Sequence, residues 1–278
     1  MKILVTGSSG FIGKNIVKEL KLDKTIQVIE TTRNEDCVGL NTYFFDIFKS
    51  DFTIDLAEYF GFPDIVLHCA WKNVKQVNNI DHINDQVFYH MKFLENLAKN
   101  GIKRISILGS CFEYGKINGE VDENKIVNPI TAYAIAKDFL RRYVEFLNRD
   151  NAFIFKWIRI FYTYDITGKD GNNIVNQLKK AIDSNDKVFN MSDGKKSFDY
   201  LEIAQLSYFI KKIITQDKIN GIINCCSGKP QTISNLLESC LKLWEKEIHL
   251  NKGFYENRDF EPDIIYGNTN KLRNILQN

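Results

Sequence analysis

The chain of 278 residues is 44% hydrophobic and 26% charged, which is ordinary for a globular protein with a sizeable core. Its 37 basic and 35 acidic residues are spread along the chain, so the net charge of +2 excludes the basic footprint of a nucleic-acid-binding protein. No apolar run approaches the roughly 18 residues of a membrane span, so we expect no membrane partner and a cytoplasmic protein.

The first twenty residues predict a strand, a tight turn and a helix. Residues 3–5 form a short apolar run, as in a strand that is buried on both faces. The stretch Thr-Gly-Ser-Ser-Gly at 6–10 breaks this run. Apolar side chains then recur at helical spacing over residues 12–20, with polar residues between them.

Three glycines at intervals of three residues shape this turn. Gly7 can adopt positive φ, Gly10 lets a phosphate approach the backbone, and Gly13 lets the helix pack closely on the strand. A pyrophosphate would lie at the helix N-terminus, where free N–H groups favour anions. The spacing G-x-x-G-x-x-G differs from the dinucleotide fingerprint G-x-G-x-x-G, so an ordinary turn between a strand and a helix is the alternative.

The stretch TGSSGFIG resembles the opening of the extended short-chain dehydrogenase/reductase superfamily, in its NAD(P)-dependent nucleotide-sugar epimerase/dehydratase group. The resemblance implies a doubly wound Rossmann domain with the cofactor bound at this turn. The residues that it assigns to the cofactor here are Gly7, Ser9, Gly10, Phe11 and Ile12.

Residues 25–32 predict the second strand, whose carboxyl end meets the adenosine ribose in such folds. An acidic residue at that end would bind the 2′-hydroxyl and repel a 2′-phosphate. Here the position is Thr32, and Arg33 follows it. A neutral residue followed by a guanidinium favours NADP(H), with NAD(H) still possible. The alternative is that Arg33 is an ordinary surface arginine.

Residues 43–47 predict a third strand, and residues 55–60 predict a short helix after it. The strand ends in Asp46 and Ile47, a pair similar to the Asp-hydrophobic pair that lies beside the adenine in the family. By this resemblance, both residues belong to the cofactor site.

Residues 64–70 predict another buried strand. The resemblance implies that Cys69 and Ala70, at its end, line the cofactor. His68 lies inside the apolar run, which favours a structural histidine over a catalytic one. Trp71 would open the active-site cleft, where it either contacts the sugar or only packs against its neighbours.

Three side chains with catalytic chemistry follow the next predicted strand, which covers residues 103–108. Ser110 ends that strand, and Tyr133 and Lys137 lie at i and i+4 on one face of a predicted helix. Taken alone, Y-x-x-x-K is also typical of an ordinary amphipathic helix. In this order and spacing the three residues resemble the catalytic triad of the superfamily, in which the tyrosine and lysine also contact the cofactor.

The chemistry explains these residue types. Hydride transfer to a ketone builds charge on oxygen that a proton must meet. A free tyrosine has a pKa near ~10, and a neighbouring ammonium lowers it. We therefore expect Tyr133 to be the general acid, Lys137 to lower its pKa and bind the nicotinamide ribose, and Ser110 to hydrogen-bond the carbonyl oxygen.

The residues after Ser110 distinguish between the reaction types that occur in the superfamily. The 4,6-dehydratases carry Asp-Glu here, the acid and base that eliminate water. GDP-fucose-synthase-like enzymes carry a cysteine base two residues before the next tyrosine. This chain has Cys111 and Phe112, and its cysteine stands one place earlier than that base. Plain hydride transfer at a carbonyl remains, or 4-epimerisation by oxidation and re-reduction.

The C-terminal half carries the expected substrate contacts. Tyr162 belongs to a stretch that resembles the R-x-F-x-x-Y-G-P motif of the family, with Asp165 in place of the glycine. Phe198 replaces an arginine that often contacts the diphosphate, which leaves Lys195 and Lys196 as candidates. The substrate-binding residues that we predict are Trp71, Cys111, Tyr162 and Lys196.

Two later stretches of the sequence indicate which group within the family the chain resembles. Residues 222–230 match the strand-N-x-x-S-G-x-P turn of the family. Residues 258–262 and 266–272 resemble the closing segment of CDP-abequose-synthase-like enzymes and dTDP-6-deoxyhexose 4-ketoreductases. The six cysteines form no C-x-x-C pair and the four histidines show no H-E-x-x-H spacing, so we expect neither a disulfide framework nor a metal site.

We therefore predict a doubly wound parallel Rossmann sheet with a smaller, mainly C-terminal α/β substrate domain. The Rossmann domain would cover residues 1–163, with 197–228 returning to it. The nucleotide-sugar domain would cover residues 164–196 and 229–278.

The predicted function is NADP(H)-dependent reduction of a nucleotide-diphosphate 4-keto-6-deoxyhexose for a surface polysaccharide, by a homodimer. The alternative is a nucleotide-sugar 4-epimerase with tightly bound NAD. A non-catalytic cofactor sensor on the same fold is disfavoured, because Ser110, Tyr133 and Lys137 are all present.

Overall fold

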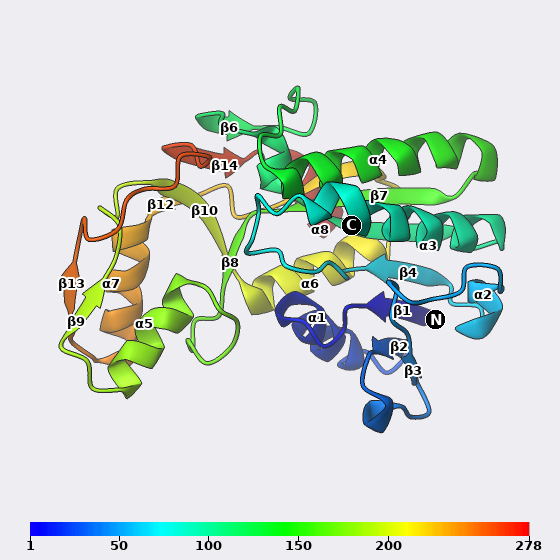
Figure 1. Ribbon diagram of the computed structural model, residues 1–278, viewed down its shortest axis with the longest axis horizontal. Helices are drawn as coiled ribbons and strands as arrows, with labels where there is room; N and C mark the ends of the chain where they lie inside the picture. Colours follow the sequence, from blue (N-terminus) through cyan, green and yellow to red (C-terminus); the bar gives the residue numbers. More distant parts are fainter. Residues whose placement is uncertain (278) are drawn as a thin grey trace.

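A large parallel sheet organises the molecule (Figure 1). The computed structural model describes residues 1–277, and its seven-stranded sheet has the order β11-β7-β5-β4-β1-β2-β3 with all neighbours parallel. Its strands are Lys2–Thr6 (β1), Gln27–Thr32 (β2), Thr42–Phe44 (β3), Ile65–His68 (β4), Arg104–Ser110 (β5), Ile154–Ile160 (β7) and Gly221–Cys225 (β11). The strand order reverses between β1 and β4, so the predicted doubly wound fold is confirmed.

Helices cover both faces of this sheet because its central strands are apolar on both sides. In β1, Leu4 belongs to one hydrophobic core, while Ile3 and Val5 belong to the other, and all three are fully buried. The first core is covered by Leu56–Tyr59 (α2), Val87–Lys99 (α3) and Ala132–Asn151 (α4), and the second by Phe11–Lys21 (α1), Ile203–Ile214 (α6) and Asn270–Leu276 (α8). None of the helices within residues 1–277 combines the length and apolar character needed to cross a bilayer.

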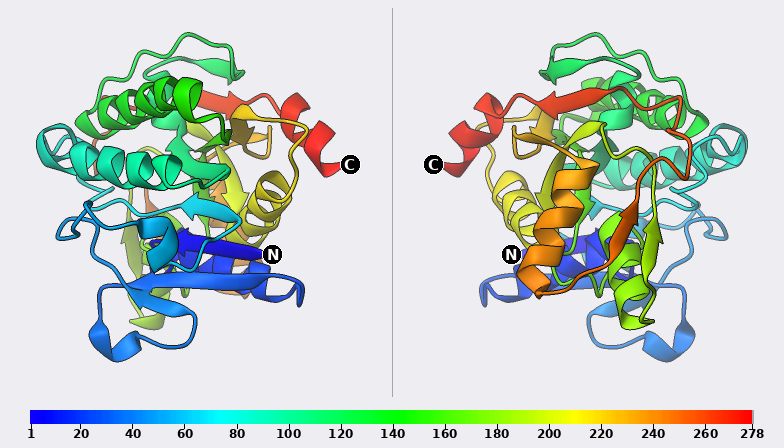
Figure 2. Two further views of the ribbon diagram at one scale, coloured as in Figure 1. Left: turned by 90° about the vertical axis from the view of Figure 1, so that its right-hand side faces the viewer. Right: turned by 90° about the vertical axis from the view of Figure 1, so that its left-hand side faces the viewer.

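A smaller α/β unit lies at one end of the molecule (Figures 1 and 2). Its five-stranded sheet runs β12-β10-β14-β6, and β8 pairs with β10. Its strands are Gly119–Val121 (β6), Tyr162–Tyr164 (β8), Ser197–Glu202 (β10), Pro230–Thr232 (β12) and Ile264–Gly267 (β14). The pair Val188–Asn190 (β9) and His249–Asn251 (β13) lies beside the helices Ile174–Asp183 (α5) and Ile233–Trp244 (α7).

The smaller sheet draws on more of the chain than the sequence predicts. Segment 116–132, for which the sequence predicts no strand, contributes β6, because Gly119 to Val121 pair with β14 near the C-terminus. The segment 197–228, expected to return to the Rossmann domain, begins with β10 in the smaller sheet and only then supplies α6 and β11. The third strand ends at Phe44, so Asp46 and Ile47 lie in the loop after it.

Candidate active site

The turn between β1 and α1 has the geometry that its glycines predict. Gly7 has φ +67°, in the left-handed region that favours glycine. The Gly10 N–H donates to the Gly7 carbonyl over 3.0 Å, which closes the turn. A Cβ on Gly13 would lie 2.2 Å from that same oxygen, so only glycine fits there. Gly10 caps α1 without a side-chain hydrogen bond, and no acidic residue lies in the first turn of the helix. The helix N-terminus is thus suited to an anion.

A cavity opens at this turn, along the carboxyl ends of β1, β2 and β4. Eight of the residues predicted for the cofactor line it: Gly7, Ser9, Gly10, Arg33, Asp46, Ile47, Cys69 and Ala70. Phe11 and Ile12 begin α1 and lie outside the lining, as do Tyr133 and Lys137. Trp71, predicted for the substrate, lines this cavity.

Two positively charged side chains, Arg33 and Lys72, line the cavity near the carboxyl end of β2. Arg33 follows the last residue of β2, as predicted. Lys72, which sequence reasoning missed, has its Nζ 3.3 Å from the centre of the Phe48 ring. Burial lowers the pKa of Lys72, Asp46 opposes this shift, and Arg33 adds to it. The three charges therefore act on one another at this end of the cavity.

Ser110, Tyr133 and Lys137 come together at the carboxyl end of β5. Ser110 is the last residue of β5, and its hydroxyl accepts from the Phe112 N–H over 3.2 Å. Tyr133 is the second residue of α4, and its backbone N–H donates to the Val77 carbonyl over 2.8 Å. Lys137 lies one turn later, with its ammonium buried and donating to the Leu108 carbonyl over 2.8 Å.

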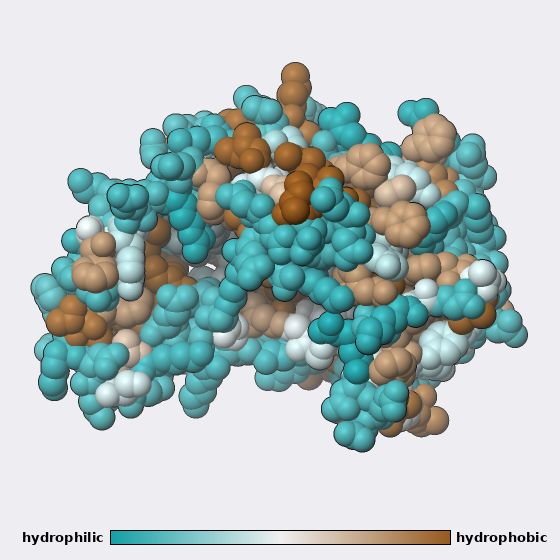
Figure 3. All heavy atoms as spheres, in the orientation of Figure 1, coloured by the Kyte–Doolittle hydropathy of each residue, from teal (hydrophilic) through white to brown (hydrophobic). Residues whose placement is uncertain are grey.

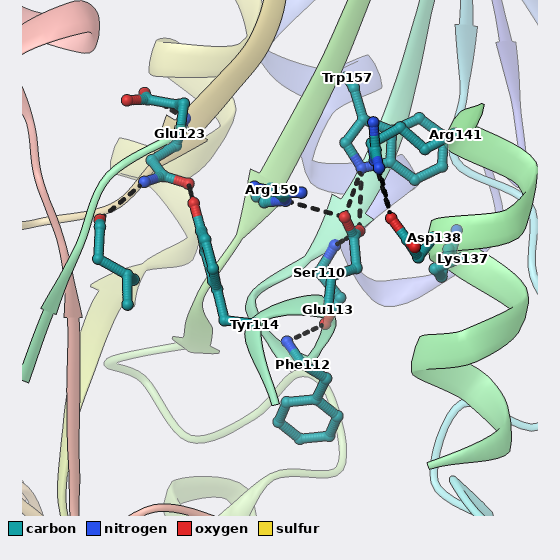
Figure 4. Close-up of polar contacts among 12 residues, drawn as sticks. Ser110, Phe112, Glu113, Tyr114, Glu123, Lys137, Asp138, Arg141, Trp157 and Arg159 are labelled. Carbon is teal, nitrogen blue, oxygen red and sulfur yellow. Dashed lines mark hydrogen bonds and ion pairs between the residues drawn. The ribbon is translucent and has the colours of Figure 1, made fainter. Parts of the chain in front are cut away.

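A buried carboxylate fixes the backbone of Ser110 (Figure 4). Glu113 is fully buried and accepts from the Ser110 N–H over 2.8 Å, which completes a capping box. It also accepts from Trp157 Nε1 and, over 2.8 Å, from Arg159 Nε, so both of its oxygens are occupied. Sequence reasoning missed Glu113, although S-x-x-E at 110–113 is the signature of a capping box.

The site shifts the pKa values of its two titratable candidates. Burial raises the pKa of Tyr133, the charge of Glu113 adds to the rise, and a hydrogen bond with Ser110 opposes it. Burial lowers the pKa of Lys137 to about 7, and Glu113 opposes that shift. The sequence predicts that Lys137 lowers the pKa of Tyr133, but the structure shows no such effect. The Lys137 ammonium donates to the Leu108 carbonyl and lies 5.9 Å from the centre of the tyrosine ring.

The histidines near the site are structural. His68 is buried, and its two ring nitrogens contact Thr6 Oγ1 at 2.7 Å and His90 Nδ1 at 2.8 Å. Burial lowers the pKa of His68 to about 3, which keeps the ring neutral. This agrees with the structural role that the apolar run around His68 favours.

A second cavity lies between the large sheet and the smaller unit. Tyr162, one of the predicted substrate residues, lines it, and its ring stacks on that of Phe198 with centres 4.2 Å apart. Phe112, Asn173, Arg258 and Glu261 line the same cavity. Phe112 also lies edge-on to Tyr133, with ring centres 6.4 Å apart, so one wall residue of the cavity contacts a catalytic candidate.

Two other predicted substrate residues lie elsewhere. Lys196 is buried outside the lining of the second cavity, and its ammonium donates to the carbonyls of Arg258 and Glu261 over 2.9 Å and 2.6 Å. It thus holds the closing segment, and the cation in the cavity wall is Arg258, whose side chain is 69% exposed. Cys111 lies in a small neighbouring pocket and is 3% exposed.

The fold and these side chains together define a class of protein. A doubly wound sheet with a glycine turn suited to an anion, a serine at the end of β5, and a tyrosine and lysine on α4 beside it is the arrangement of a dinucleotide-dependent oxidoreductase. The model of the NAD dependent epimerase/dehydratase family matches residues 3–226, and the chain belongs to this family of enzymes.

Characterised relatives agree with this assignment. Over 276 residues, the chain is 31% identical to dTDP-6-deoxy-L-talose 4-dehydrogenase (NAD(+)) of Aggregatibacter actinomycetemcomitans, covering 96% of this chain and 99% of that protein. It is 25% identical to dTDP-4-dehydro-6-deoxyglucose reductase of Escherichia coli, covering 90% and 82% of the two chains.

A solved structure shares the fold. UDP-glucuronic acid 4-epimerase of Bacillus cereus superposes with a TM-score of 0.82 at 18% identity, covering 100% of this chain and 93% of that one.

Proposed function

We propose that the protein is an NADP(H)-dependent reductase of a nucleotide-diphosphate 4-keto-6-deoxyhexose, which delivers hydride to C4 in the cytoplasmic synthesis of a sugar for a surface polysaccharide. The observation that carries this proposal is the position of the Tyr133 ring between a wall residue of the first cavity and a wall residue of the second. It lies edge-on to Trp71 of the first cavity, at 5.9 Å, and to Phe112 of the second, at 6.4 Å. A dinucleotide in one cavity and a sugar in the other would meet beside this phenol.

Each catalytic candidate has one role in this reaction. A bound nicotinamide supplies the hydride. The Ser110 hydroxyl donates a hydrogen bond to the carbonyl oxygen of the sugar, where negative charge develops. The Tyr133 hydroxyl, which stays protonated because burial raises its pKa, gives its proton to that oxygen. The Lys137 ammonium binds the nicotinamide ribose.

The residues beside Ser110 argue against elimination of water. Phe112 has no group that transfers a proton, and burial raises the pKa of Cys111 well above its ordinary value. A buried thiol of this kind stays protonated and cannot act as a base near neutral pH. Reduction at C4 needs neither residue as an acid or a base.

The direct test is turnover of purified protein with NADPH and dTDP- or CDP-4-keto-6-deoxyglucose. We expect one NADPH oxidised per sugar reduced, and NMR of the product should show a single 4-hydroxy epimer. The 4-epimerase alternative makes the opposite prediction: NAD⁺ copurifies at about one per chain, and two nucleotide sugars interconvert without added cofactor. That pair of results would overturn the proposal.

The preference for NADP(H) rests on Arg33 and Lys72, which face the cavity at the end of β2, where Thr32 is uncharged. A 2′-phosphate would be attracted by both cations. We expect NADPH to bind at least about tenfold more tightly than NADH, a difference of about 1.4 kcal/mol. Arg33→Ala should remove most of this difference, while Arg149→Ala, on a distant helix end, should not. Fluorescence titration with both cofactors measures it, and equal affinities in the wild type would refute the preference.

The expected homodimer is supported by an apolar surface on α3 and α4, which pack side by side (Figure 1). Brown, hydrophobic side chains gather over this region in Figure 3. Phe88, Ile135, Phe139 and Phe146 on these helices are exposed by 52%, 40%, 51% and 61%. Exposed aromatic side chains that gather on one face of a soluble protein are typical of a protein–protein interface. We propose that two copies of the chain meet through this face.

A further inference from the structure

We infer that Trp71 is a positioning residue that holds the side chain of Lys137 as an ammonium in the buried site. The inference rests on the proposed function, because it assigns Trp71 a role through the catalytic lysine. Lys137 Nζ lies 4.0 Å from the centre of the Trp71 ring, well inside the range of a cation–π interaction. Trp71 therefore acts on the cation and need not contact the sugar.

The other surroundings of Lys137 explain why an aromatic face matters there. The residue is 3% exposed, and within residues 1–277 its ammonium donates one hydrogen bond, to the Leu108 carbonyl. Glu113 favours the ammonium through its charge, but its oxygens are occupied by Ser110, Trp157 and Arg159. Because burial lowers the pKa of Lys137 to about 7, a small additional stabilisation of the cation decides its charge near neutral pH.

The indole is held in place from two directions. Its ring stacks on His90, with centres 4.3 Å apart and planes within 3°. Its Nε1 donates to His82 Nδ1 over 3.1 Å, while His82 Nε2 lies 3.1 Å from the Gln76 carbonyl. Since the carbonyl can only accept and the indole N–H can only donate, His82 is the neutral Nε2–H tautomer. His90 is fully buried and contacts His68, so the stack has a rigid base.

Several other titratable groups act on Lys137. They are Glu113, Cys69, Tyr133 and the imidazoles of His68, His82 and His90. The charge of Lys137 itself contributes to the lowered pKa values of the three histidines, after burial. Burial keeps His68 and His90 neutral while Lys137 titrates, so the titration is read from the Lys137 signal itself.

The test is a pH titration of the Lys137 ammonium in the cofactor-free protein by NMR of ¹⁵N-labelled lysine, with the signal assigned from Lys137→Arg. Trp71→Leu should lower the apparent pKa of Lys137 by about one unit, and Trp71→Phe, which keeps an aromatic face, by less. Trp244→Leu is the matched control, because it removes an indole that also donates one hydrogen bond but lies on α7. An unchanged titration in Trp71→Leu would overturn the inference.

Fluorinated tryptophan placed site-specifically at 71 tests the same idea without reshaping the site. Each added fluorine weakens the π face, so the pKa of Lys137 should fall stepwise while the fold is kept. Absence of a stepwise fall would also overturn the inference, whatever the behaviour of Trp71→Leu.

The pH profile of kcat/KM separates this inference from the proposed function. Activity that needs the ammonium falls as pH rises through the pKa of Lys137, so Trp71→Leu should move this fall to lower pH by the shift seen in the titration. If the titration moves but no nucleotide sugar is reduced, the proposed function fails while the effect of Trp71 on Lys137 stands. If turnover is normal but neither the titration nor the profile moves, the inference fails alone.

Discussion

At the scale of single residues, the candidate site combines a phenol that stays protonated with a lysine that titrates near neutral pH. Burial favours the neutral form of both side chains. It therefore raises the pKa of Tyr133, whose neutral form carries the proton, and lowers the pKa of Lys137, whose neutral form has lost it. Tyr133 thus keeps its proton near neutral pH, whereas the positive charge of Lys137 needs support from its neighbours.

Replacement of the phenol tests its role directly. Tyr133→Phe keeps the ring contacts with Trp71 and Phe112 and removes the proton, so kcat should fall by roughly 10²–10⁴-fold. NADPH affinity should change little. Tyr208→Phe, at an exposed tyrosine on α6, should have normal steady-state kinetics. Turnover of Tyr133→Phe within a factor of a few of wild type would mean that another group supplies the proton.

Glu113 should matter for stability as well as for activity. Glu113→Gln removes one charge from a fully buried ion pair and leaves Arg159 uncompensated, so the free energy of unfolding should fall by about 3–5 kcal/mol. Glu145→Gln breaks a pair in which the carboxylate is 40% exposed, and should cost less than about 1 kcal/mol. Denaturant unfolding measures both variants, and equal losses would show that burial of the Glu113 pair is unimportant.

At the scale of elements, two short structures place the chemistry: the glycine turn before α1, and the first two turns of α4. Thr131 caps α4 by accepting from the Ala134 N–H over 3.2 Å, which sets where the helix begins. Tyr133 and Lys137 then follow on one face of it. The position of the helix start therefore determines which side chains face Ser110.

The close contact at Gly13 in the glycine turn predicts how a substitution there affects stability and cofactor binding. Gly13→Ala would place a Cβ 2.2 Å from the Gly7 carbonyl, so the turn must open, with a loss of about 1–3 kcal/mol in unfolding free energy and weaker NADPH binding. A Cβ at Gly39 meets no atom within 4 Å, so Gly39→Ala is the control. Calorimetry and cofactor titration measure the effect. Wild-type behaviour of Gly13→Ala would mean that the close contact does not shape the turn.

At the scale of the whole molecule, the second cavity exists only because two sheets meet. Tyr162 comes from β8, Phe198 from β10 and Glu261 from the closing segment before β14. Asp170, between β8 and α5, forms an ion pair with Lys14 and accepts from Asn15, so the smaller unit is tied to the helix that follows the glycine turn.

The proposed dimer face gives a prediction at this scale. Phe139→Glu places a charge in the middle of the apolar surface on α4, so the mass in solution should drop from that of two chains to that of one. Phe254→Glu changes a residue that is 58% exposed outside this surface, and should leave the mass unchanged. Light scattering after gel filtration measures both, and a wild-type protein with the mass of one chain would exclude the dimer.

The sequence by itself determined the glycine turn, the alternating strands and helices, and the grouping of Ser110, Tyr133 and Lys137. These features depend on local geometry: glycine permits positive φ, residues four apart share a helix face, and parallel strands end at one edge of the sheet. Even the structural role of His68 followed from the apolar run around it.

Only the tertiary structure decided the rest. Glu113 acquires its role from Trp157 and Arg159 on β7, β6 becomes a strand by pairing with β14, and Lys196 turns to backbone carbonyls of the closing segment. In each case the partner is distant in the chain. Such contacts depend on how the two sheets pack, because a side chain takes the partner that burial brings within reach.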